Sequence, residues 1–121
     1  GVELNRAAVK DAIQNAKRNG VKNITFYQKD AGEFMVQLSE QHAHIDVVFM
    51  DPPRSGSDEA FLSSLCKLKA DRVIYISCGP DTQARDLQYL TKHGYRVKRI
   101  RPVDMFPWTS HTECIAEIVR N

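Results

Sequence analysis

The sequence has no long hydrophobic run, few cysteines and almost no net charge. Its most apolar stretch, residues 45–50, is interrupted by Asp46 and falls far short of the roughly 18 residues that a membrane span needs. No basic segment followed by an apolar one opens the chain, so no secretory signal is expected. The formal net charge of +2 indicates no partner by itself. Membrane-spanning, fibrous and disulfide-stapled proteins are therefore excluded.

The three cysteines are Cys66, Cys78 and Cys114. They form no Cys-x-x-Cys pair, and no histidine lies at zinc-finger spacing, so neither a disulfide framework nor a metal site is expected. Free thiols are typical of a cytoplasmic protein. Cys66 and Cys114 lie in apolar stretches and are interpreted as small core residues.

The 121 residues, 42% of them hydrophobic, suffice for one domain in which short apolar strands alternate with amphipathic helices. This alternation predicts an α/β domain with a mainly parallel sheet. No helix separates the last two strands, so one antiparallel strand is expected, and the strand at 45–50 is expected to be covered on both faces. The predicted strands are residues 1–4, 24–27, 45–50, 72–77, 95–100 and 113–119. The predicted helices follow the caps Asn5 and Ser57, span about 32–40, and run from Pro80 to Gly94 with Ala84, Leu87 and Leu90 inward.

Polar residues stand at the predicted carboxyl ends of four strands, where α/β sheets bind their ligands. They are Glu3, Asp30, Asp51 and Cys78. A carboxylate such as that of Glu3 accepts hydrogen bonds from the two hydroxyls of a ribose. The alternative for Glu3 and Asp30 is that each acid only favours the dipole of the helix that follows it.

The segment Asp51-Pro52-Pro53-Arg54 fixes the direction of the Asp51 carboxylate, because two prolines stiffen the backbone directly after a strand. Similar loops in amino-group methyltransferases receive a flipped base, but they carry an aromatic residue where this chain has Arg54. A rigid turn without chemistry is the alternative. In Ser77-Cys78-Gly79-Pro80, a thiol precedes a helix whose amino end favours the thiolate.

Basic residues are concentrated late in the chain, with ten basic against six acidic side chains from residue 61 onward. This distribution has two interpretations, a phosphate-binding surface and a solvated strand face. The following loop carries Phe106 and Trp108, which either stack on a base or seal the core edge. A non-catalytic RNA-binding module using these residues is therefore one candidate. The clustered basic side chains are Arg96, Lys98, Arg99 and Arg101.

Taken together, four segments resemble, in order and spacing, the bacterial RNA uracil-5-methyltransferases. They are Gly1-Val2-Glu3-Leu4, Asp51-Pro52-Pro53-Arg54-Ser55-Gly56, Ser77-Cys78-Gly79-Pro80, and Asp104-Met105-Phe106-Pro107 with His111-Thr112-Glu113. The resemblance covers residues 1–121 and implies a Rossmann-like class I methyltransferase fold, S-adenosylmethionine as cofactor and RNA as partner. The resemblance further implies that this RNA is 23S ribosomal RNA or transfer RNA, and 23S ribosomal RNA is the favoured expectation.

By position, the resemblance implies that Cys78 is the nucleophile, that Glu113 is the general base, and that Glu3, Asp30 and Asp51 line the cofactor site. Uracil C5 is a poor nucleophile, so thiolate addition at C6 would activate it and a carboxylate would then remove the C5 proton. Two departures stand out. Gly79 replaces the family's usual Asn, and the chain starts at the family's second strand, without the first strand and its Gly-rich loop.

Three expectations follow. The 121-residue chain alone is expected to have little methylation activity, because half the cofactor cradle is missing. An unpaired sheet edge is expected to cause rearrangement or formation of a homodimer. The alternative enzyme, an amino-methyltransferase using Asp51-Pro52-Pro53, needs no cysteine, so the effect of Cys78→Ala separates the two.

Overall fold

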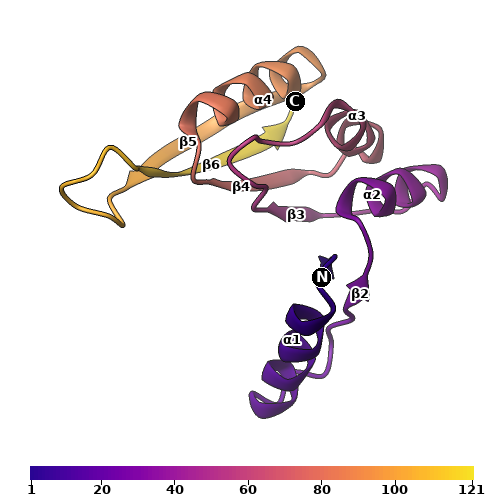
Figure 1. Cartoon of the computed structure of the whole chain (residues 1–121). Helices are drawn as coiled ribbons and strands as arrows, with labels where there is room; N and C mark the ends of the chain where they lie inside the picture. Colours follow the sequence, from indigo (N-terminus) through magenta and orange to yellow (C-terminus); the bar gives the residue numbers. More distant parts are fainter.

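The computed structural model describes residues 1–121, and in it strands and helices alternate until the final two strands (Figure 1). The predicted α/β class is confirmed. Asn5 caps the first helix as predicted, since its side chain accepts hydrogen bonds from the backbone N–H groups of Ala7 and Ala8. The elements are β1 (Val2–Glu3), α1 (Arg6–Arg18), β2 (Tyr27–Gln28), α2 (Ala31–Glu40), β3 (Val47–Met50), α3 (Glu59–Leu68), β4 (Arg72–Ser77), α4 (Pro80–Lys92), β5 (Tyr95–Val103) and β6 (Glu113–Arg120).

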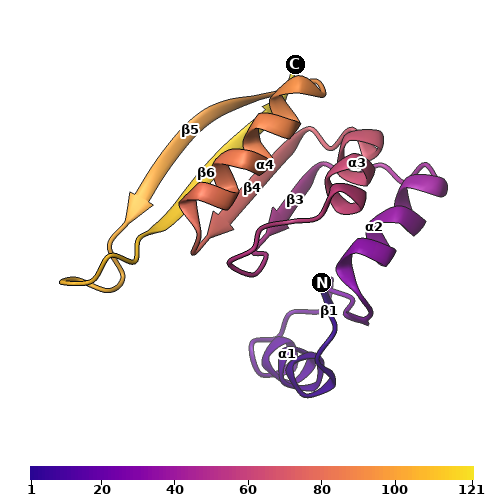
Figure 2. The same ribbon diagram turned by 45° about the horizontal axis from the view of Figure 1, so that its top comes forward.

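The strands form two separate sheets (Figure 2). One contains only β1 and β2, which are parallel. The other has the order β3-β4-β6-β5, with β3 parallel to β4 and with β6 antiparallel to both of its neighbours. This confirms the mainly parallel arrangement with one antiparallel strand. No ladder joins β1 to β3.

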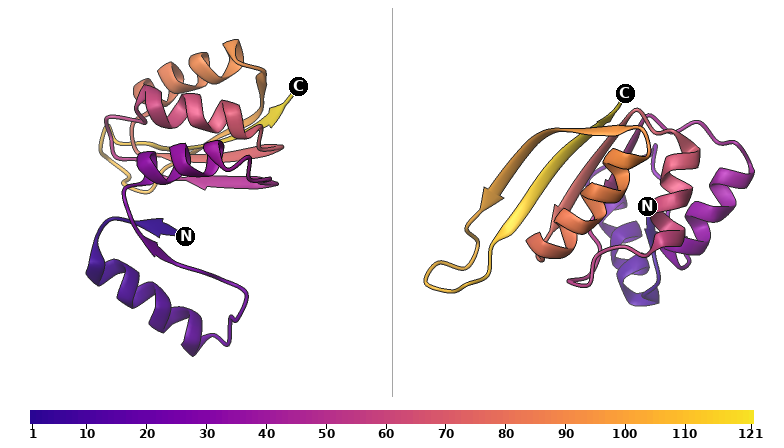
Figure 3. Two further views of the ribbon diagram at one scale, coloured as in Figure 1. Left: turned by 90° about the vertical axis from the view of Figure 1, so that its right-hand side faces the viewer. Right: turned by 90° about the horizontal axis from the view of Figure 1, so that it is seen from above.

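Helices α2, α3 and α4 lie on one face of the four-stranded sheet, and α1 lies apart beside β1 and β2 (Figure 3). The core forms between the three helices and the face of the sheet that they cover. Alternate residues of β4 and β6 point into it, as the pleat of a strand requires. Its fully buried members include Leu65, Val73, Tyr75, Leu90 and Ile118.

The opposite face of the sheet is open, and this overturns the expectation that the strand at 45–50 is covered on both sides. Phe49 keeps 73% of its surface exposed and Val47 keeps 40%. Both residues point away from the three helices, and no helix of this structure packs on that side. An apolar sequence of this kind is typical of a doubly covered strand, but its surroundings decide its burial.

Three other local predictions were wrong. The second strand is residues 27–28, not 24–27, because its pairing partner β1 offers two residues. Asp58, rather than Ser57, caps α3 by accepting a hydrogen bond from the backbone N–H of Phe61. In α4, Ala84 is exposed, and Gln83 and Asp86 take inward positions beside Leu87 and Leu90. None of the helices combines the length and the hydrophobicity that a membrane-spanning segment needs.

Candidate functional site

Two hollows lie at the carboxyl ends of the strands, and the loop of residues 51–57 borders both. The larger, a cavity of about 730 Å³, also extends along β3 and is lined by residues of β1, α2, β3, α3 and this loop. The smaller, of about 160 Å³, surrounds Cys78. Asp51, Pro52, Pro53 and Ser55 line the larger hollow, whereas Arg54 lines the smaller one. A single short loop therefore contributes to both.

Glu3 and Asp30 meet at the larger cavity, as the rule for strand ends predicts. An oxygen of Glu3 accepts a 2.7 Å hydrogen bond from the backbone N–H of Asn5. Oδ1 of Asp30 accepts a 3.0 Å hydrogen bond from the backbone N–H of Glu33, which makes Asp30 the cap of α2. One oxygen of each carboxylate is thus used to cap or orient a helix start, and the other is left without a protein partner. The helix-capping alternative and the ligand-binding alternative are therefore compatible for these acids.

Asp51 follows β3 and is one of four acidic residues that line the cavity, with Glu3, Asp30 and Asp58, the last of which caps α3. Phe34, Met50 and Phe61 supply apolar wall between them. Acceptors of this kind suit a ligand with paired hydroxyl groups and a positive charge, and the apolar wall suits a flat ring. These acceptors and the apolar wall therefore fit a nucleoside that carries a sulfonium group, and a volume of about 730 Å³ accommodates a molecule of that size.

Cys78 lies directly after β4 and is half-buried at the smaller hollow. Gly79 caps α4, and Pro80 occupies its first turn as predicted. In the ladder between β4 and β6, the last paired residues are Ser77 and Cys114. One step further along this register places Glu113 opposite Cys78, although Glu113 is not among the residues that line the hollow. The thiol and the carboxylate therefore come from adjacent strands at the same end of the sheet.

Arg54 and His111 are in contact at the hollow around Cys78. A guanidinium N–H of Arg54 donates to Nδ1 of His111 over 3.3 Å, and both residues line the smaller hollow. By sequence alone, Arg54 only marks a departure from the aromatic position of amino-methyltransferase loops. In the structure it supplies a positive charge beside the thiol, from a loop 24 positions earlier in the chain.

Gly79 allows the loop of residues 51–57 to lie against α4. A Cβ atom at position 79 would stand 2.8 Å from the carbonyl oxygen of Arg54 and 2.9 Å from Oγ1 of Thr82. Both distances are too short for a real Cβ contact, so any side chain here displaces the loop or the helix. In this chain the space at position 79 is therefore too small for the Asn side chain that the family usually has there.

A buried carboxylate that the sequence reasoning missed fixes the far end of the same loop. Asp86 is fully buried, and its Oδ2 accepts 2.8 Å hydrogen bonds from the backbone N–H of Ser57 and from the hydroxyl of Tyr75. Arg85 donates to Oδ1 of Asp86 and to the carbonyl oxygens of Ser55 and Ser57. The sequence signal that identifies Asp86 is its place in the helical pattern. It lies three residues after Gln83 and one before Leu87, and a helix brings these positions to one inward face.

The surroundings of the other ionisable groups indicate structural roles. Burial raises the pKa of the Cys66 and Cys114 thiols, as expected for core residues. Burial and the hydrogen bond to Asp86 raise the pKa of Tyr75, which stays a neutral donor. Burial raises the pKa of Tyr95 to about 12, and its hydroxyl donates to the carbonyl oxygen of Ala70.

The predicted basic cluster lies on β5, the edge strand of the larger sheet. Arg96, Arg99 and Arg101 are exposed, while Lys98 pairs with Glu117 over 3.2 Å. At the end of β5 the loop carrying Phe106 and Trp108 begins, and both aromatic side chains are exposed. They do not seal the core edge.

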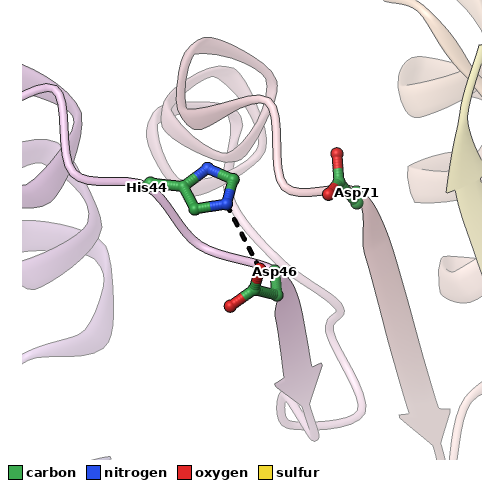
Figure 4. Close-up of side chains that lie close together, drawn as sticks. All are labelled: His44, Asp46 and Asp71. Atoms are coloured by element: carbon green, nitrogen blue, oxygen red, sulfur yellow. Dashed lines mark hydrogen bonds and ion pairs between the residues drawn. The ribbon is translucent and has the colours of Figure 1, made fainter.

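One further group of charged side chains lies at the opposite end of the sheet (Figure 4). His44 and Asp46 pair over 3.2 Å before β3, and Asp71 lies close to them before β4. All three are exposed, and Asp71 is already paired with Arg120 over 2.8 Å. This group is remote from the carboxyl ends of the strands, where the two hollows lie.

The family model and two of the curated relatives that match this chain are described as RNA methyltransferases. The profile of the family described as tRNA (Uracil-5-)-methyltransferase matches residues 1–120. A protein of Halalkalibacterium halodurans named as an uncharacterized RNA methyltransferase is 47% identical over 116 residues, which are 96% of this chain and 25% of that protein. One of Staphylococcus epidermidis with the same description is 48% identical over 120 residues, covering 99% of this chain and 26% of that protein. The chain thus spans about a quarter of the length of the curated relatives it matches.

Solved structures agree with the sequence comparisons. The Pyrococcus abyssi tRNA (uracil-54, C5)-methyltransferase in complex with S-adenosyl-L-homocysteine superposes with a TM-score of 0.82 at 32% identity, over 98% of this chain and 28% of that one. A precorrin-6y C5,15-methyltransferase from Geobacter metallireducens superposes with a TM-score of 0.74 at 18% identity, over 98% of this chain and 65% of that one, and indicates the fold alone. The predicted Rossmann-like class I methyltransferase fold is confirmed.

Proposed function

This chain belongs to the tRNA (uracil-5-)-methyltransferase family, and from that premise we propose that it is part of a catalytic domain that methylates carbon 5 of uracil in RNA. The family uses S-adenosylmethionine. We propose 23S ribosomal RNA, ahead of transfer RNA, as the substrate, and a role in rRNA processing in the cytoplasm. The single observation that supports the proposal most is the ladder register of β4 and β6, whose next step beyond Ser77 and Cys114 would pair Cys78 with Glu113.

Three carboxylates are proposed to hold the cofactor in the larger cavity. Glu3 and Asp30 each have an oxygen available for ribose hydroxyls, and Asp51 opens the loop of residues 51–57, which also borders the hollow around Cys78. When bound there, S-adenosylmethionine supplies the methyl group as an electrophile. Its adenine would lie against the apolar wall that includes Phe34 and Phe61.

Cys78 is proposed to activate the uracil. Its thiolate adds to C6, the new S–C6 bond takes the place of the C5–C6 double bond, and the displaced electron pair makes C5 nucleophilic. Once C5 carries the methyl group, Glu113 removes the C5 proton. The electron pair left by that proton restores the double bond, and the thiolate leaves C6. The base must leave its stack before the thiol can reach C6.

Arg54 is proposed to act on the same base. Its guanidinium, a delocalised cation, lies at the hollow with Cys78. A fixed positive charge beside C6 favours the thiolate and offsets the negative charge that develops on the pyrimidine. His111, which accepts a hydrogen bond from Arg54, orients that guanidinium.

The test uses the full-length protein that contains this chain and RNA substituted with 5-fluorouridine, whose C5 fluorine cannot be removed as a proton. With S-adenosylmethionine present, we expect a protein–RNA adduct that survives denaturation. Cys78→Ala should abolish the adduct, while the control Cys66→Ala, which lies on α3 away from the hollow, should retain it. Full methylation by Cys78→Ala would overturn the proposal and favour amino-group methylation through Asp51-Pro52-Pro53.

Glu113 has a separate test with ordinary uridine RNA. If it is the base, Glu113→Gln should stall after methyl transfer and accumulate a covalent complex that Cys78→Ala never forms. A Glu113→Gln variant that turns over normally would remove the carboxylate from the mechanism. Separate incubations with 23S ribosomal RNA and transfer RNA decide the substrate.

We also propose a second copy of the chain as a partner of the 121 residues taken alone. The edge of β3 is unpaired, and Phe49 and Val47 are exposed beside it. Sedimentation of the isolated chain should detect a dimer, and Phe49→Lys should weaken it. A monomeric wild-type chain at high protein concentration would contradict this. The isolated chain should transfer little methyl group to RNA.

A further inference from the structure

The loop of residues 104–112, between β5 and β6, projects beyond the end of the sheet (Figures 1 and 2). It carries three large apolar side chains that the structure leaves in solvent. Met105 is 61% exposed, Phe106 is 55% exposed and Trp108 is fully exposed. Exposed apolar side chains gathered on one loop indicate a surface that contacts another molecule, because they do not pack into the core of this chain.

The loop has a defined shape because its own hydrogen bonds hold it. The backbone N–H and the hydroxyl of Thr109 both donate to the carbonyl oxygen of Phe106, over 3.2 and 2.7 Å. The backbone N–H of His111 then donates to the hydroxyl of Thr109 over 3.2 Å. These bonds enclose Trp108 in a tight turn.

Trp108 has a backbone conformation that a tryptophan rarely adopts. Its φ of +69° lies in the left-handed region, where glycine and asparagine are at ease and a bulky side chain is strained. Such strain is retained where a side chain must be presented in one direction. Here it presents an indole that is open to solvent.

The surroundings of the loop favour a nucleic acid. Ser110, His111 and Thr112, which follow Trp108 closely, line the hollow around Cys78. Arg54 is at the same hollow, and Arg101 is exposed near the base of the loop. Guanidinium groups suit phosphates and an open indole face suits a base.

We propose that Trp108 is a stacking platform for an unpaired base that neighbours the target uridine in the RNA. This inference rests on the proposed function and adds a binding contact outside the reacting groups. Extraction of the uridine toward Cys78 leaves an adjacent base without its stacking partner, and the indole replaces that partner. Trp108 thereby contributes to the choice of RNA rather than to the chemistry.

Two variants of the full-length protein test the proposal. Trp108→Ala removes the ring and should raise the KM for a uridine-containing stem–loop RNA about tenfold, the size expected for losing one base–aromatic stack. Trp108→Phe keeps a stacking ring and should restore most of that loss. Neither variant should change kcat or the KM for S-adenosylmethionine. Ile24→Ala, an exposed apolar residue before β2, is the matched control and should leave the KM for RNA unchanged.

Fluorescence supplies a second readout. Trp108 is the one tryptophan of these 121 residues, and subtracting the emission of Trp108→Phe from that of the full-length wild type isolates its signal. We expect the emission of an indole exposed to water. The stem–loop RNA should quench this emission, and a fully paired RNA of the same composition should not. Emission that is already shielded without RNA would overturn the proposal and indicate a protein contact. An unchanged KM for Trp108→Ala would also overturn it.

The two proposals fail separately. If the 5-fluorouridine adduct forms normally but RNA leaves the Trp108 signal and the KM unaffected, only the stacking proposal is lost. If the stem–loop quenches Trp108 but no adduct forms, the loop binds RNA and the covalent mechanism is wrong.

Discussion

The hydroxyl of Thr82 donates a 2.8 Å hydrogen bond to the carbonyl oxygen of Arg54, which ties the first turn of α4 to the loop after β3. Cys78 precedes this helix turn, and Asp51 opens that loop. This hydrogen bond therefore helps to set the distance between the Cys78 thiol and the larger cavity, which Asp51 lines. The contact is close because residue 79 has no side chain.

Gly79→Ala should therefore damage the site. Its Cβ would meet the backbone oxygen of Arg54 at 2.8 Å, so we expect a loss of about 1–3 kcal/mol in the free energy of unfolding. Urea unfolding measures this loss, and the yield of the 5-fluorouridine adduct should fall as well. Ala84→Ser, at an exposed position of the same helix, should change neither quantity. Unchanged stability of the Gly79→Ala variant would show that the loop can move away freely.

Asp86→Asn should be more harmful than Tyr75→Phe. The Asn side chain loses the charge that faces Arg85, and its amide group turns a donor toward partners that are themselves donors. We expect a loss of about 2–4 kcal/mol for a buried charged partner. Removing only the Tyr75 hydroxyl should cost about 1 kcal/mol. Urea unfolding of the two variants measures which loss in the free energy of unfolding is larger. Equal losses would show that the Asp86 carboxylate contributes no more than its hydrogen bond with Tyr75.

The three thiols should differ in reactivity. Burial raises the pKa of Cys66 and Cys114, and Cys114 is also closed to reagents, so both should react slowly at about pH 8. Cys78 lines an open hollow and should be alkylated first. Mass mapping after brief treatment with iodoacetamide identifies the modified residue. Preferential labelling of Cys66 would contradict the assignment of Cys78 as the accessible thiol.

Glu117 should give the protein an acid-sensitive component of stability. The hydrogen bond from Lys98, with Arg72 and Arg99 nearby, holds the pKa of this carboxyl below its ordinary value. A lowered pKa in the folded state stabilises the fold above the unfolded-state pKa, and that contribution is lost as the pH falls through the folded-state value. Comparing urea unfolding of wild type and Glu117→Gln from about pH 7 to about pH 3 should therefore show a wild-type advantage that shrinks with acid. An advantage that stays constant across this range would contradict the linkage.

The features that the sequence predicted correctly depend on neighbouring residues. The Asn5 cap, the strand at 72–77 and the start of α4 at Pro80 are local choices, and all three are in the structure. The rule for strand ends also brought Glu3 and Asp30 to one cavity without knowledge of their contacts. Local chemistry and a general property of parallel sheets were sufficient for these features.

The features that were missed depend on distant partners. The exposure of Phe49 follows from which face of the sheet the helices cover, and hydrophobicity alone does not specify that face. The inward position of Asp86 requires Ser57 and Tyr75, which lie 29 and 11 residues earlier. Likewise, the register that brings the start of β6 and the end of β4 together joins residues 37 positions apart, Ser77 and Cys114, so no local pattern specifies it.

The position of β6 has a consequence for how the protein is made. This strand, Glu113–Arg120, lies between β4 and β5, both of which precede it in the chain. While a ribosome is still adding these residues, β4 has no neighbour on that side, and its hydrophobic edge is available to chaperones or to other nascent chains. The larger sheet closes in one late step, after all of its other strands have been synthesised, and slow translation of this stretch would prolong the interval in which aggregation competes with folding.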